Sequence, residues 1–200
     1  NNPGGTVVNC GTFTLPNMSA NAGFKINNFG STNFSNTFTF NGDITINNKE
    51  GGVFNYTIPF ILDNNSTLVN NGSFIGNLDF TIKSGSSFTN SGYLDTGNGA
   101  IIINSNFTNN GFIKTSSTFT LNASSVMTNN CSIESEDSFY NYSGNSINNG
   151  NVFVTGAGSV ILNSKWTQSA TGNMVGTIFS STSAVEGQGN YYFTGQTTNT

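Results

Sequence analysis

Apolar residues recur along this chain in short groups, and within each group they lie two positions apart. This period indicates β-strands, whose side chains alternate between two faces. The groups return about every 20 residues together with a small turn dipeptide. The clearest dipeptides are Asn71-Gly72, Ser91-Gly92, Asn110-Gly111, Asn130-Cys131 and Asn149-Gly150, spaced by 20, 19, 20 and 19 residues. A repeat of this length predicts one coil of a solenoid per repeat.

Gly30 and Gly52 extend this series upstream and Gly172 extends it downstream. Each repeat carries apolar residues at three places, counted from the second residue of the dipeptide or from these glycines. Two residues after it come Phe54, Phe74, Leu94, Ile113, Ile133, Val152 and Met174. Eight and ten residues after it come Phe38 and Phe40, Phe60 and Leu62, Phe80 and Ile82, then Phe119 and Leu121. Four residues before it come Ile26, Leu68, Phe88, Phe107 and Met127. The pattern predicts an all-β chain that forms a single parallel β-helix (β-solenoid), with about 20 residues and three short strands per coil. One interior column is expected to contain Phe38, Phe60, Phe80, Phe119 and Phe139.

Composition supports coils with polar corners. Charged residues make up 7% of the chain, which contains 36 Asn, 24 Gly and 18 Phe. Asn and Gly tolerate the left-handed backbone angles of tight corners, and Phe suits the faces of strands. Asn residues also precede the corners, and their amides are expected to stack in a ladder and bond the turn backbone. The ladder residues are Asn70, Asn90, Asn109, Asn129 and Asn148.

With these coils, corners and low charge, the chain resembles the right-handed parallel β-helices of bacterial surface adhesins, such as filamentous haemagglutinin and autotransporter passengers. The resemblance is one of pattern and covers residues 22–175, the expected solenoid core. It implies a right-handed coil and an extracellular or cell-surface location. Residues 1–21 are expected to form an N-terminal strand or edge segment. Residues 176–200 are expected to form a C-terminal covering segment and a flexible tail.

Both terminal segments carry apolar residues that suit exposed strand edges. Val7, Phe13 and Leu15 lie in the first, and the second contains Tyr191, Tyr192 and Phe193. Uncapped solenoid ends expose edges that invite pairing with another chain. We therefore expect head-to-tail self-association into a filament. The alternative is that the chain is a piece of a longer solenoid.

Chemistry-bearing residues are sparse. There is no His for a Ser triad and no Arg, and the glycines fit corners better than nucleotide loops. The acidic residues cluster once, at Glu134, Glu136 and Asp137, which reads either as a weak cation site or as a solvated turn. A net charge of −4 with five Lys disfavours nucleic acid. We expect no enzyme activity, no cofactor, no metal and no membrane insertion.

The two cysteines are too far apart for an intrachain disulfide if the coils stack regularly. Cys10 belongs to the first coil and Cys131 to a much later one. Counting coils separates them by about 25–30 Å along the axis, whereas a disulfide needs Cα atoms within about 7 Å.

N-glycosylation sequons are frequent, as the composition makes inevitable. The candidates are Asn17, Asn33, Asn55, Asn64, Asn65, Asn71, Asn106, Asn122 and Asn141. In a eukaryotic secreted protein several should carry glycan, whereas in a bacterial protein they occur by chance. Asn130 also starts a sequon, but we expect its side chain in the internal ladder.

Three function classes follow. The first is an extracellular structural or adhesive rod, with a carbohydrate or surface receptor as a candidate partner. The second is an ice- or carbohydrate-binding solenoid with a flat Thr face, for which the candidates are Thr12, Thr14, Thr37, Thr39, Thr118 and Thr120. A polysaccharide-active β-helix enzyme is the least favoured class, because clustered carboxylates with basic partners are missing.

Overall fold

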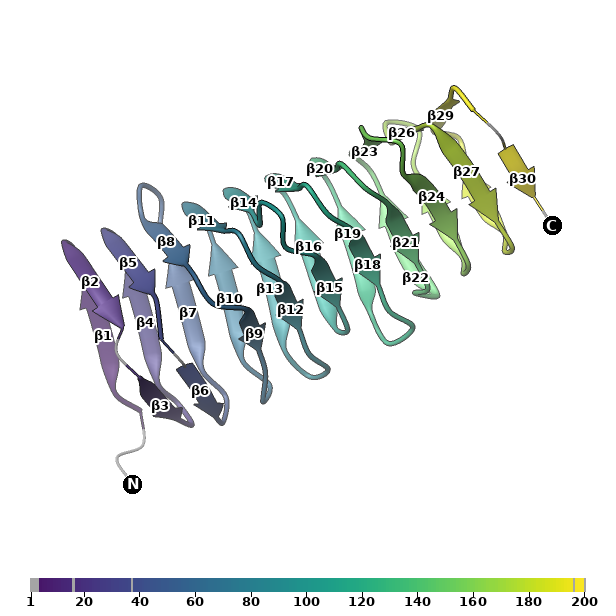
Figure 1. Cartoon of the computed structure of the whole chain (residues 1–200). Coiled ribbons are helices and arrows are strands. Elements are labelled where there is room, and N and C mark those ends of the chain that lie inside the picture. The colour runs from purple at the N-terminus through teal and green to yellow at the C-terminus, as the bar shows by residue number, and fades with distance from the viewer. Residues whose placement is uncertain (1–3, 16, 37, 196, 200) are drawn as a thin grey trace.

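The computed structural model describes residues 4–15, 17–36, 38–195 and 197–199, and they form a parallel β-solenoid with about 20 residues per coil. Stacked coils build an elongated rod with the two termini at opposite ends (Figure 1). Every described strand pairing is parallel, as the repeat predicts. The right-handed sense of the coil stays a prediction.

Three walls make up the rod. Wall 1 is a 10-stranded sheet of β1 (Thr6–Asn9), β4 (Lys25–Asn28), β7 (Thr45–Asn48), β10 (Thr67–Asn70), β13 (Ser87–Asn90), β16 (Asn106–Asn109), β19 (Val126–Asn129), β22 (Asn145–Asn148), β25 (Trp166–Gln168) and β28 (Val185–Gly187). Wall 2 is a 10-stranded sheet of β2 (Thr12–Leu15), β5 (Ser31–Phe34), β8 (Val53–Tyr56), β11 (Ser73–Gly76), β14 (Tyr93–Asp95), β17 (Phe112–Thr115), β20 (Ser132–Ser135), β23 (Asn151–Val154), β26 (Asn173–Gly176) and β29 (Asn190–Phe193). Wall 3 is an 8-stranded sheet of β9 (Phe60–Leu62), β12 (Phe80–Ile82), β15 (Ile101–Ile103), β18 (Phe119–Leu121), β21 (Phe139–Asn141), β24 (Ser159–Leu162), β27 (Ile178–Ser181) and β30 (Thr197–Asn199). A separate two-stranded sheet, the N-terminal pair, contains β3 (Met18–Asn21) and β6 (Phe38–Asn41).

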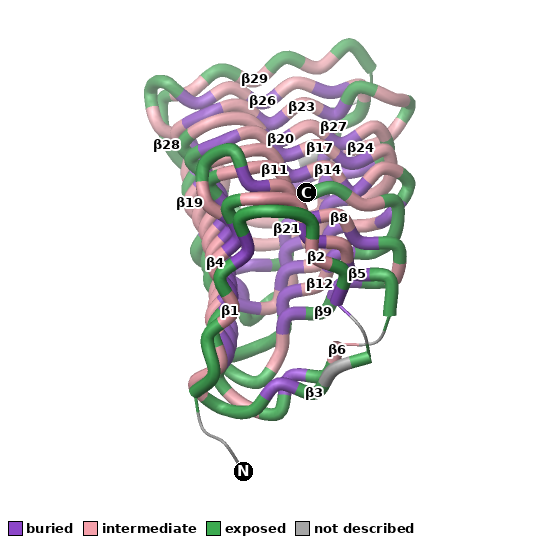
Figure 2. The backbone as a smooth tube through the Cα atoms, turned by 90° about the vertical axis from the view of Figure 1, so that its left-hand side faces the viewer, coloured by how far each residue is buried: buried purple, intermediate pink, exposed green. Residues whose placement is uncertain are grey.

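Stacked apolar columns fill the interior, and buried positions repeat from coil to coil along the tube (Figure 2). In wall 3, Phe60 and Phe80 pair in register with ring centroids 5.4 Å apart, and Phe119 and Phe139 repeat the same 5.4 Å stack. The expected column is therefore confirmed for these four rings. It is wrong for Phe38, which lies half-buried in the N-terminal pair.

The Asn ladder is confirmed at the corner between walls 1 and 2. Each Nδ2 donates to the Oδ1 of the next Asn, at 2.7–2.9 Å, from Asn9 to Asn148, and Asn148 donates to Gln168 Oε1 at 3.0 Å. The same amides donate to backbone carbonyls of the next coil, as Asn129 does to Asn151 O at 3.0 Å. This column satisfies turn backbone that would otherwise be buried without partners.

A second polar column, which the repeat pattern did not reveal, lies at the corner between walls 3 and 1. Its buried residues are Ser66, Ser86, Ser105, Ser125 and Ser143. The Ser66 N–H donates to the Ser86 hydroxyl at 3.2 Å, and the Ser105 hydroxyl donates to Ser86 O. Ser is too abundant on the outside of the coils for its inward copies to stand out in the sequence.

Stacking extends beyond residues 22–175. β1 pairs with β4 at one end, and β28, β29 and β30 pair with β25, β26 and β27 at the other. Cys10 and Cys131 are free thiols in coils six strands apart in wall 1, about 29 Å along the axis. Within the described ranges, no helix is long and apolar enough to span a membrane.

Candidate functional site

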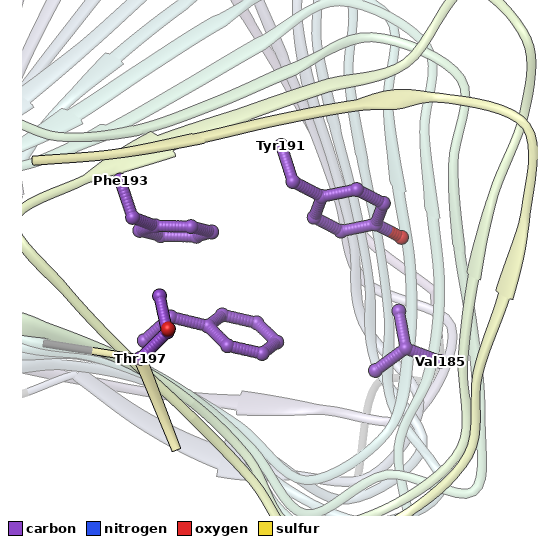
Figure 3. A pocket seen from close by; sticks show the side chains of 5 residues that line it. Val185, Tyr191, Phe193 and Thr197 are labelled. Atoms are coloured by element: carbon purple, nitrogen blue, oxygen red, sulfur yellow. The ribbon is translucent and has the colours of Figure 1, made fainter. Parts of the chain in front are cut away.

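An apolar cavity of about 430 Å³ opens at the last coil. We call it the end cavity; its lining residues are Phe179, Val185, Tyr191, Phe193 and Thr197. Figure 3 shows Val185, Tyr191, Phe193 and Thr197 facing one another across it. The lining comes from β27, β28, β29 and β30, so all three walls contribute.

The end cavity is the solenoid interior seen in cross-section. Tyr191 and Val185 pair in register with the buried residues Met174 and Trp166 of the coil below. Phe179 and Phe193 pack with ring centroids 4.8 Å apart. These side chains occupy inward positions but stay half-buried, so a further coil would complete their burial.

The Tyr191 hydroxyl faces this interior without a partner. Among the described residues, its Oη is the one buried side-chain polar atom that makes no hydrogen bond. Burial raises the pKa of Tyr191 to about 12. A buried hydroxyl without a partner costs free energy, and a covering coil could supply the acceptor.

The structure separates the six residues expected to take part in assembly. Tyr191 and Phe193 line the end cavity, but Tyr192 points away and is 58% exposed. Val7 and Phe13 are half-buried and Leu15 is buried in the first coil, at the opposite end of the rod (Figure 1). Within the described chain, β1 and β2 pair on one side only, with β4 and β5. Among the described residues, both ends of the rod thus carry half-buried apolar side chains beside strands that pair on one side only.

Two of the three acidic residues in the cluster lie beside a lysine from the neighbouring coil. Lys114 Nζ lies 3.3 Å from Glu136 Oε1 and 4.0 Å from Glu134 Oε1. The hydrogen bond to Glu136, with the nearby Glu134 charge, raises the Lys114 pKa. Asp137 is exposed, and no group of three metal-ligating side chains occurs in the described residues. The geometry favours an ion-paired surface over a cation site.

The described candidate Thr residues do not share one face. Thr12 and Thr14 lie on wall 2, Thr118 and Thr120 at wall 3, and Thr39 in the N-terminal pair, while Thr37 lies outside the described residues. Wall 1 instead carries an outward column in which Thr89, Thr108 and Thr128 pair in register. Each of these precedes a ladder Asn, so a recurring Thr-Asn dipeptide was the signal that could have located the column.

The outward face of wall 1 also contains a shallow hollow of about 420 Å³. Its lining residues are Val126, Thr128, Gly144, Asn145, Ser146, Ile147, Lys165 and Thr167. Val126 and Ile147 are 42% and 43% exposed. Lys165 is ion-paired with Glu186 at 3.0 Å, so the hollow combines apolar and polar groups without a free catalytic pair.

Most of the candidate glycosylation residues are at the surface. Asn17, Asn64, Asn65, Asn71 and Asn106 are exposed, and Asn33, Asn55 and Asn122 are half-buried. Asn141 is fully buried, and its amide donates to Ser164 O and Lys165 O at 3.3 and 3.4 Å, which leaves no room for a glycan in the folded chain. The expectation for Asn130 is wrong, because its exposed side chain bonds Asn110 and Asn149 in an outer ladder beside the internal one.

No family model, curated protein or solved structure matches this chain.

Proposed function

We propose that this chain is an extracellular structural or adhesive rod that extends by stacking further coils on its ends, without enzymatic activity. The observation that carries the proposal is the end cavity, an apolar interior lined from three walls and left half-buried. The resemblance to surface adhesins adds the right-handed coil, the extracellular location and a surface receptor or carbohydrate partner to the proposal.

Head-to-tail stacking would continue each of walls 1 and 2 with the same wall of the second copy. All the strands of a wall run parallel, so β1 of a second copy can follow β28, and β2 can follow β29, without a change of direction. Val7, Phe13 and Leu15 of that copy would then lie over the end cavity. A head-to-tail contact of this kind repeats indefinitely and builds an open filament. Further coils of the same polypeptide would satisfy the same geometry, and this is the competing explanation.

A charge in the end cavity tests the proposal. Phe193→Asp should abolish filaments seen by electron microscopy and lower the sedimentation coefficient to that of a monomer, because a buried unpaired carboxylate is costly. Tyr192→Asp is the matched control, since Tyr192 is its exposed neighbour and points outward. Deleting residues 1–15 should have the same effect as Phe193→Asp. An intact chain that stays monomeric at high concentration would exclude self-assembly and leave coil continuation as the explanation.

As a second candidate we propose an ice- or carbohydrate-binding face on wall 1. It is favoured by the in-register column of Thr89, Thr108 and Thr128. Ile147 interrupts this column before Thr167. Thermal hysteresis and binding to insoluble polysaccharides, each lost in Thr108→Lys, would support this face over the rod proposal. Thr81→Lys on wall 3 is the control.

A further inference from the structure

Wall 3 is interrupted near its N-terminal end while walls 1 and 2 run through the same coils. β6 and β9 follow each other in successive coils but belong to different sheets. In wall 1, β4, β7 and β10 pair without a break, and in wall 2 so do β5, β8 and β11. Figure 1 shows β3 and β6 set apart from the row of wall 3 strands. We call this break the seam.

Ring crowding explains the seam. β6 supplies two Phe residues, whereas each strand of wall 3 supplies at most one. Phe40 packs against Phe60 at 6.3 Å between centroids, and Phe34 packs against both Phe38 (5.5 Å) and Phe60 (5.7 Å). At the wall 2 position of Phe34 the next coil carries the also buried Tyr56, but the wall 3 strand of that coil supplies a single Phe, and the coil after it carries Gly76. Too much side-chain volume in one coil displaces the backbone, so the strands separate here.

The break leaves strand-edge groups available. The Phe60 N–H donates to Asp79 O, and Leu62 O accepts from the Lys83 N–H, so both point toward β12. Because successive residues of a strand alternate in this direction, the Ile61 N–H and C=O point toward the seam. On the β6 side, the Asn64 side-chain amide donates to Phe40 O, where a neighbouring strand would otherwise donate.

Two hollows lie along the seam and share Phe40. The first is an apolar cavity of about 140 Å³, lined by Phe34, Phe38, Phe40, Ile58, Pro59, Phe60 and Ile61. An apolar cavity of about 150 Å³ holds one benzene-sized group in other proteins. The second is a polar hollow of about 660 Å³, lined by Phe40, Asn41, Gly42, Asp43, Asn64 and Asn65. Along β6 the chain runs from the apolar hollow toward the polar one, which contains the exposed Asp43 carboxylate.

We propose that the seam binds an extended peptide segment of another chain, which places one phenyl-sized side chain in the apolar cavity and a basic side chain beside Asp43. The segment lies parallel to β9 and hydrogen-bonds to the free Ile61 edge, as in β-strand addition to other sheet edges. The apolar residue precedes the basic one, because the strand direction takes the peptide from Phe38 toward Asp43. The charge is complementary to that carboxylate and to the chain's net charge of −4. This site lies within the rod and does not depend on end-to-end stacking.

A fluorescently labelled peptide with the sequence of residues 78–84 is a suitable probe. It reproduces β12, the strand that pairs with the other edge of β9, and it carries Phe80 followed by Lys83. Fluorescence anisotropy with the full chain should show saturable binding, and a scrambled peptide should bind at least about tenfold more weakly if side-chain placement matters. Equal binding of the two peptides would overturn the proposal.

Two variants test the site itself. Ile58→Trp fills the apolar cavity and should weaken the probe at least about tenfold. Ile102→Trp is the control, because Ile102 occupies the outward column of wall 3 away from the seam. Equal losses in both would overturn the proposal. Asp43→Lys should weaken the probe and strengthen a probe carrying Lys83→Glu, by about threefold each, the scale of an exposed ion pair. The exchange of charge preference in Asp43→Lys tests the site even if Ile58→Trp fails to fold. If Asp43→Lys does not change the relative binding of the two probes, the proposed site is wrong.

Discussion

The middle coils and the last coil have the same pattern of inward side chains. They differ in burial, because a middle coil is covered by a neighbouring coil on both sides and the last coil on one side only. In the middle, Phe80 is fully buried between the rings of adjacent coils, and the Asn column bonds from coil to coil. At the last coil, Tyr191 and Phe193 occupy equivalent inward positions but are only half-buried, and the Tyr191 hydroxyl has no partner. A coil of this solenoid is therefore completed by its neighbours, and the inward residues of the last coil are covered on one side only.

Removing a ring from the closed interior should have the largest effect. Phe80→Ala removes a fully buried side chain that stacks on Phe60, so it should lower the free energy of unfolding by roughly 3–5 kcal/mol. The measurement is the urea unfolding midpoint followed by circular dichroism. A loss below about 1 kcal/mol would contradict the closed interior.

Breaking the internal Asn ladder should have the second-largest effect on stability. Asn129 donates to Asn148 and Asn151 and accepts from Asn109, so Asn129→Ala leaves buried polar groups unpaired. We expect a loss of roughly 2–5 kcal/mol, from the cost of each group left without a partner. The matched control is Asn130→Ala, one residue away in the exposed outer ladder, which should cost less than about 0.5 kcal/mol. If Asn129→Ala and Asn130→Ala lower the free energy of unfolding by similar amounts, the internal ladder adds no more stability than the exposed outer ladder.

The repeat made the closed interior predictable from sequence, and the departures from it were not. Asn129 and Phe80 recur at constant offsets because each coil repeats the same contacts. Phe38 obeys the offset too, but its pairing depends on the volume of Phe34 and Phe60 in neighbouring coils, which a one-dimensional pattern does not contain. The sequence predicts an apolar strand edge at Tyr191, Tyr192 and Phe193, and strand alternation places Tyr192 on the face opposite to its two neighbours. The pairing of Tyr191 with the buried Met174 is what shows which of the two faces is inward.

Removing a ring at the last coil should lower the free energy of unfolding by less than Phe80→Ala does. Phe193→Ala removes a half-buried ring that packs on Phe179, so we expect a loss of roughly 1–2 kcal/mol in the monomer. The comparison can be sharpened by repeating the urea titration on assembled material. If stacking covers the end cavity, the cost of Phe193→Ala should rise toward that of Phe80→Ala; an unchanged cost would argue that no coil lies over Phe193.

The smallest expected effect is a pH dependence that belongs to the open end. Burial raises the pKa of Tyr191 from 10.0 to about 12, so the folded state keeps a proton that the unfolded state releases first. Its contribution to stability is therefore fully present below pH 10 and is lost as the pH rises toward 12. Tyr93, whose pKa is also raised to about 12 by burial and by its bond to Asp95, adds to the same window, so Tyr191→Phe is needed to isolate the residue. Between pH 10 and pH 12 the urea midpoint of the wild type should fall more steeply than that of Tyr191→Phe, so the difference between the two proteins should change across this window. Parallel curves would mean that Tyr191 is solvated, and that the last coil is more open than the middle coils even at its inward face.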